Sequence, residues 1–79
     1  MIRGIGPPVI AVEQIGYRAL LRKEPEGGYT AVVPTLQGCI SYGDTIEEAI
    51  DMAREAIEGY LDSLRAHGEE IPTEQDLIE

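Results

Sequence analysis

The fold is decided by the segment GGYTAVVPTLQGCISYGDTIEEA, residues 27–49, which contains two strand patterns and the start of a helix. Its two leading glycines suit a hairpin turn, because glycine takes positive φ without steric cost. The β-branched and aromatic residues 29–33 predict a strand that ends at Pro34, which cannot donate to a ladder. Residues 39–42 alternate apolar and polar side chains and predict the next strand. Thr45, followed by a glutamate three residues later, forms a capping box and predicts a helix start.

A long amphipathic helix is predicted over residues 45–67, because apolar side chains recur there at steps of three and four residues. The recurring positions are Ile46, Ala49, Ile50, Ala53, Ile57, Tyr60, Leu61 and Leu64. Gly68 supplies a left-handed stop, and His67 is expected to bond to the last helix carbonyls rather than to act in catalysis. The opposite face is acidic, and we predict that it binds a partner protein. This predicted site consists of Glu47, Asp51, Glu55, Glu58 and Asp62.

The remaining segments add strands and ends to this helix. Residues 1–8 are expected to form a flexible arm, because glycines and a proline pair deny them regular structure. Residues 17–23 alternate and predict a strand, whereas residues 9–16 fit either an added strand or an irregular lead-in. Residues 73–79 fit either a short edge strand or a frayed end. We therefore predict one α+β domain over residues 9–79, in which a small three-stranded antiparallel sheet packs on one long helix in the order β-β-β-α, with a short fourth strand as an open alternative.

The charge of the chain is unevenly distributed. Residues 1–43 hold three acids and four Lys or Arg, a balance of +1, whereas residues 44–79 hold twelve acids and two Arg, a balance of -10. Such a field repels phosphate and favours basic proteins, so direct nucleic-acid binding is disfavoured. The longest aliphatic run, residues 9–12, is far shorter than the roughly 20 residues of a membrane helix. We expect a cytoplasmic protein that does not bind membranes.

The sequence offers little for catalysis or for cross-linking a small core. Cys39 is the only cysteine, so an internal disulfide is impossible, and a buried, inert thiol is expected. No cluster of Cys or His suggests a metal, and no cofactor motif is present. Glu13, Glu24 and Asp44 are the only carboxylates outside the helix and tail that a hydrolase could use. We predict that the protein is not an enzyme, and that its marginal core is completed by oligomerisation or by a partner.

Residues 17–72 resemble the HicB antitoxin family, whose small domain has a truncated ribonuclease-H-like arrangement. The resemblance rests on the glycine pair with Tyr29, on Pro34 followed by Gly38 and Cys39, on the helix entry GDTIEEA over residues 43–49, and on the exit from Gly68 to Pro72. Family members commonly have proline where Gln37 stands, so the loop before Gly38 departs slightly from the pattern.

The resemblance implies a partner of the HicA type, a small basic toxin that cuts messenger RNA and is inactive while an antitoxin covers it. Many HicB proteins append a DNA-binding domain, for which this chain has no room, so we expect it not to bind an operator by itself. An unpaired sheet edge would favour a homodimer or homotetramer. Two other functions stay open: a solitary oligomeric interaction module without a toxin, and a carboxylate-dependent hydrolase.

Overall fold

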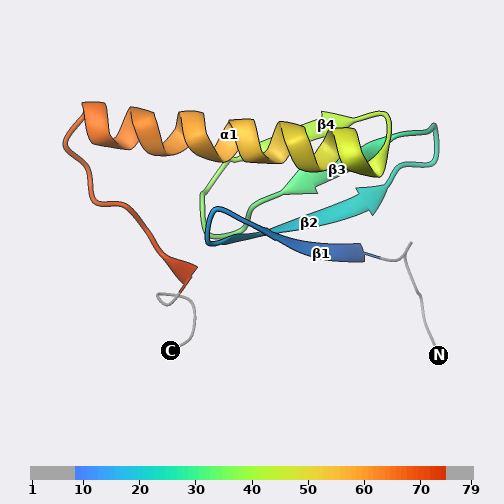
Figure 1. Ribbon diagram of the computed structural model, residues 1–79, viewed down its shortest axis with the longest axis horizontal. Coiled ribbons are helices and arrows are strands. Elements are labelled where there is room, and N and C mark those ends of the chain that lie inside the picture. Colours follow the sequence, from blue (N-terminus) through green and yellow to red (C-terminus); the bar gives the residue numbers. More distant parts are fainter. Residues whose placement is uncertain (1–8, 75–79) are drawn as a thin grey trace.

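The structure, a computed structural model, describes residues 9–74 and consists of a four-stranded antiparallel sheet covered on one face by a single long helix (Figure 1). The elements are β1 (Val9–Gln14), β2 (Tyr17–Lys23), β3 (Tyr29–Val32), β4 (Ile40–Gly43) and α1 (Ile46–Ala66). The strands lie in the order β1-β2-β3-β4, so each strand pairs with its neighbour in sequence. The predicted α+β class, with a small sheet on one helix, is confirmed.

The fourth strand is β1, within the segment that the sequence pattern left open. It pairs with β2 from Val9 opposite Arg22 to Gln14 opposite Tyr17. At the other end of the chain, residues 73 and 74 are not in a strand, and residues 75–79 lie outside the described part. The predicted flexible arm, residues 1–8, also lies outside it.

Both ends of α1 have the predicted caps. Thr45 is the N-cap, and its hydroxyl accepts the Glu48 N–H at 3.0 Å, while the Glu48 carboxylate accepts the Asp44 N–H at 2.9 Å. At the C-terminus Gly68 has φ 68°, and the Glu69 N–H bonds back to the Leu64 carbonyl at 2.9 Å, as in a Schellman motif. His67 Nδ1 lies 2.8 Å from the Ser63 carbonyl oxygen, which confirms its predicted capping role.

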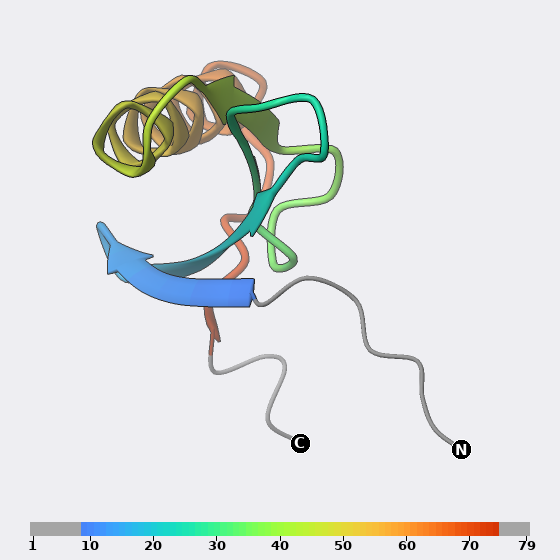
Figure 2. The same cartoon turned by 90° about the vertical axis from the view of Figure 1, so that its right-hand side faces the viewer.

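Small residues bring α1 close to the sheet. Ala49 and Ala53 on the helix, and Ala19 and Ala31 on β2 and β3, are all buried. Figure 2 shows the sheet curving around α1, so that the helix fills the concave side and leaves the opposite face without a helix. The other buried side chains of the core are Tyr17, Leu21, Val33, Leu36, Cys39, Ile57 and Leu61.

The turn between β1 and β2 contains a strained residue. Ile15 and Gly16 have φ of 54° and 81°, as a two-residue type I′ hairpin requires. A β-branched residue at positive φ costs about 1–3 kcal/mol. We therefore expect Ile15→Asn to raise the free energy of unfolding by about 1 kcal/mol and the Tm by about 4–8 °C, measured by circular dichroism. An unchanged or lower Tm would mean that packing of the Ile15 side chain outweighs the strain.

Candidate protein-interaction surfaces

The five carboxylates of the predicted site lie on the solvent side of α1. All five residues are exposed, and the buried Ala49, Ala53, Ile57 and Leu61 occupy the opposite side of the same helix. The heptad-like spacing of three and four residues places the five acids in one stripe along about four turns. We call this stripe the acidic face; it comprises Glu47, Asp51, Glu55, Glu58 and Asp62.

Only the C-terminal half of the acidic face has basic partners on the helix. Arg54 Nε lies 3.9 Å from the Glu58 carboxylate, and Arg65 Nη1 lies 3.0 Å from the Asp62 carboxylate. Within residues 9–74 no ion pair involves the other three acids of the face. These three, Glu47, Asp51 and Glu55, follow one another at four-residue steps, so each neighbouring pair repels by a few tenths of a kcal/mol. A cationic partner would relieve that repulsion.

A second surface is the open face of the sheet, which the sequence analysis missed. The register places Ala11, Leu20, Val32 and Ile40 opposite one another across the four strands. We call these four side chains the apolar row. Val32 and Ile40 are 36% and 62% exposed. The signal was present in the sequence, because both the odd and the even positions of residues 17–23 and 29–33 include apolar side chains, whereas a sheet with one wet face alternates cleanly.

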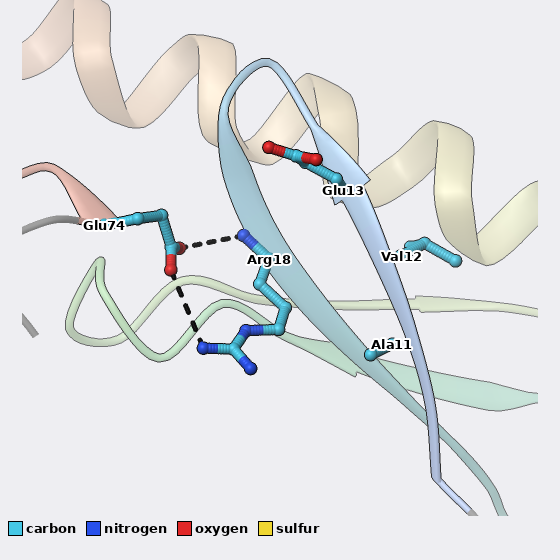
Figure 3. Close-up of a pocket in the computed structure, with 5 residues that line it drawn as sticks. All are labelled: Ala11, Val12, Glu13, Arg18 and Glu74. Atoms are coloured by element: carbon cyan, nitrogen blue, oxygen red, sulfur yellow. Dashed lines mark hydrogen bonds and ion pairs between the residues drawn. The ribbon is translucent and has the colours of Figure 1, made fainter. Parts of the chain in front are cut away.

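Hydrogen bonds hold the C-terminal tail beside the start of β2, where β2 is not paired with β3. The Glu74 carboxylate accepts the Arg18 N–H at 2.8 Å and lies 3.9 Å from the Arg18 guanidinium (Figure 3). It also accepts the Thr35 hydroxyl at 2.9 Å. The Tyr17 hydroxyl donates to the Pro72 carbonyl. Glu74 and Arg18 line a surface hollow of about 310 Å³ with three residues of β1, Ala11, Val12 and Glu13. These bonds hold the tail at the end of the sheet.

The carboxylates considered for a hydrolase come from separate places in the fold. Glu13 lies in β1, Glu24 in the turn after β2, and Asp44 directly before the N-cap of α1. Within residues 9–74, no group of three or more His, Cys, Asp or Glu side chains is arranged to hold a metal ion. In the same part of the chain, no helix is both long enough and apolar enough to cross a membrane.

Cys39 is buried, as predicted, in the loop between β3 and β4. Burial raises the pKa of its thiol, because the thiolate would lose solvation. The unfolded chain therefore loses this proton first, so the free energy of unfolding begins to fall as the pH rises above about 8.5, where an unfolded cysteine titrates, and stops falling above the raised pKa of the native thiol. We expect a thiol reagent such as DTNB to label the native protein at pH 8 far more slowly than the protein in guanidinium. Equal labelling rates would contradict the burial.

An α+β domain with an acidic helix face and an exposed apolar row is suited to binding other proteins. The sequence model of the HicB-like antitoxins of bacterial toxin–antitoxin systems matches residues 17–79. The chain therefore belongs to the HicB-like antitoxin family, and this membership favours a non-enzymatic role.

The curated relatives include several UPF0150 proteins. The chain is 55% identical over 62 residues to one from Synechocystis sp., a match that covers 78% of this chain and 77% of the relative. It is 41% identical over 56 residues to one from Thermoplasma acidophilum, covering 71% of this chain and 81% of the relative. A third, from Helicobacter pylori, is 50% identical over 48 residues, covering 61% of this chain and 65% of the relative. No solved structure matches the chain at a significant level.

Proposed function

We propose that this protein binds and neutralises a small basic RNA-cutting toxin of the HicA type by covering its RNA-binding or active surface. The observation that carries the proposal is the acidic face of α1 on a member of an antitoxin family, with three carboxylates that have no ion pair within residues 9–74. Carboxylates held on a capped, rigid helix keep their spacing when they meet a partner, which lowers the entropy cost of binding.

The charge pattern supports a toxin of this class. A protein that cuts RNA must attract phosphate, so its surface is basic, and a row of carboxylates can compete with RNA for that surface. The same carboxylates would repel DNA, so we propose that the chain does not bind nucleic acid by itself. A toxin that cuts messenger RNA acts in the cytoplasm, and the proposal places this protein there.

Co-purification from the host tests the proposal. We expect a tagged full-length chain to retain a small basic protein in a stoichiometric ratio, and that protein, once separated, to cut RNA. A gel-shift assay with promoter DNA of the gene for this protein tests whether the protein binds nucleic acid by itself. Tight, salt-resistant and sequence-specific binding of the chain to that DNA, or the absence of any basic partner, would contradict the proposal.

The second candidate is a homo-oligomeric interaction module of the same fold that acts without a toxin. The exposed side chains of the apolar row favour it, because a small domain with a limited core gains stability when copies bury such residues. We propose that the chain forms a homodimer or homotetramer in either case. Light scattering at micromolar concentration measures this directly, and a stable monomer would contradict it.

A further inference from the structure

We propose that the open face of the sheet is the interface between two copies of this chain, which stack sheet on sheet with their helices outermost. This assigns a surface to the homo-oligomer of the proposed function and rests on that part of it. It is independent of whether a toxin binds, because the acidic face of α1 lies on the other side of the sheet and stays free in the dimer.

The apolar row is continuous across the sheet. Its four members come from four different strands and are held side by side by the register of the sheet. Val9 and Tyr42 lie on the same face in the adjacent row and are 53% and 51% exposed. A hollow of about 250 Å³ on this face is lined by Val9, Leu20, Arg22, Thr30 and Val32. Exposed apolar side chains that form a continuous patch around a hollow mark an interaction surface.

The charge of the two faces favours a second copy over the basic toxin as the partner of the open face. Helix α1 carries six acidic residues and two arginines, a net charge of -4. On the open face Arg18 and Arg22 stand against Glu13, and Glu74 and Glu24 each lie 3.9 Å from one of the two guanidinium groups, so these five groups leave a charge of only -1. A basic partner would therefore be attracted far more strongly to α1 than to this nearly neutral face. Two open faces meet with little charge on either side, and the strongly acidic helices then point away from each other.

Two copies of the apolar row can face each other in a symmetric dimer. Consider a two-fold axis that runs parallel to the strands in the plane between the two sheets, midway between β2 and β3. It places β1 of one copy over β4 of the other, and β2 of one copy over β3 of the other. Leu20 then faces Val32 of the second copy, and the small Ala11 faces the protruding Ile40 of the second copy. Each edge contact therefore pairs a small side chain with a large one. Stacked sheets lie about 10 Å apart, a distance that such side chains fill.

Sedimentation equilibrium of the full-length chain between about 1 and 100 μM tests the interface. We expect the wild-type protein to dimerise, and both Val32→Glu and Ile40→Glu to weaken the dimer by at least about 100-fold, since each places two carboxylates in the buried patch. Ile10→Glu is the matched control, because Ile10 is 39% exposed but lies on the other face of β1. It should leave the dimer intact. Circular dichroism checks that all three variants remain folded, and Ile40, at 62% exposure, is the substitution least able to disturb folding.

The outcomes separate this interface from the other proposals. A dimer that persists in Ile40→Glu overturns the open-face interface but leaves the oligomer standing, whereas a wild-type monomer at 100 μM overturns both. A monomer that dimerises only after deletion of residues 1–8 or 75–79 would show that a segment of the chain itself covers the face, which also overturns the proposal. If the wild-type protein dimerises but binds no toxin, that result counts against the toxin proposal alone.

Discussion

Replacement of Gly43 by alanine should lower the free energy of unfolding by about 3 kcal/mol or more, which is a large part of the stability of a domain this small. A Cβ at Gly43 would lie 2.3 Å from the Ala49 nitrogen and 2.6 Å from the Ala49 Cα. Both atoms belong to the backbone of α1, so no side chain can rotate to make room. The end of β4 would have to move away from the first turns of the helix, and that movement would open the core around Ala49.

Gly59→Ala is the matched control. Gly59 lies within α1, and a Cβ there would meet nothing within 4 Å. Since alanine favours a helix over glycine by about 1 kcal/mol, this variant should be stabilised by about that amount. Urea unfolding followed by circular dichroism measures both changes. If Gly43→Ala retains the wild-type midpoint, the close approach of β4 and α1 is not a constraint on the fold.

The sequence predicted most of the elements around Gly43, because their signals are local. A capping box, a left-handed glycine and a proline each act within a few residues, and α1 begins and ends within one residue of the predicted 45–67. The strand bounds differ from prediction by one residue: β3 ends at Val32 and not at residue 33, and β4 runs from Ile40 to Gly43 and not over residues 39–42. The close approach of Gly43 to Ala49 could not be predicted, since it depends on how the helix packs over the end of β4.

The features that sequence reasoning missed depend on pairing between distant residues. Strand β1 could not be distinguished from an irregular segment until its pairing with β2 was known. The apolar row exists only because four separate registers align Leu20 with its neighbours. The contact of Glu74 with Arg18 joins residues 56 positions apart. The predicted acidic face, by contrast, follows from helical periodicity alone, and all five of its residues are exposed.

Neutralising the N-terminal half of the acidic face should weaken toxin binding. The triple variant Glu47→Gln, Asp51→Asn and Glu55→Gln keeps the size of each side chain and removes three charges that have no ion pair within residues 9–74. At about 0.5–1 kcal/mol for each exposed contact, we expect the Kd for the toxin to rise about 10- to 100-fold at 0.1 M salt. The triple variant also removes two like-charge repulsions, so its stability should change by less than about 1 kcal/mol.

A second triple variant with the same net charge provides the control for that loss. Glu26→Gln, Glu69→Gln and Glu70→Gln neutralise three exposed acids that lie in the β2–β3 turn and after α1. Calorimetric titration of the toxin into both variants compares them. The control should slow association slightly through the weaker overall field but retain most of the affinity. Equal losses in the two variants would mean that total charge, and not the acidic face, governs binding.

The central claim is that this chain inactivates a basic RNA-cutting toxin through α1. Cleavage of a labelled RNA by the toxin, measured while this protein is added in increasing amounts, tests that claim most directly. The account predicts complete inhibition near an equimolar ratio, and a requirement for a large excess of the Glu47→Gln, Asp51→Asn, Glu55→Gln variant. Undiminished cleavage at every ratio, or equal inhibition by the wild-type protein and that variant, would contradict it.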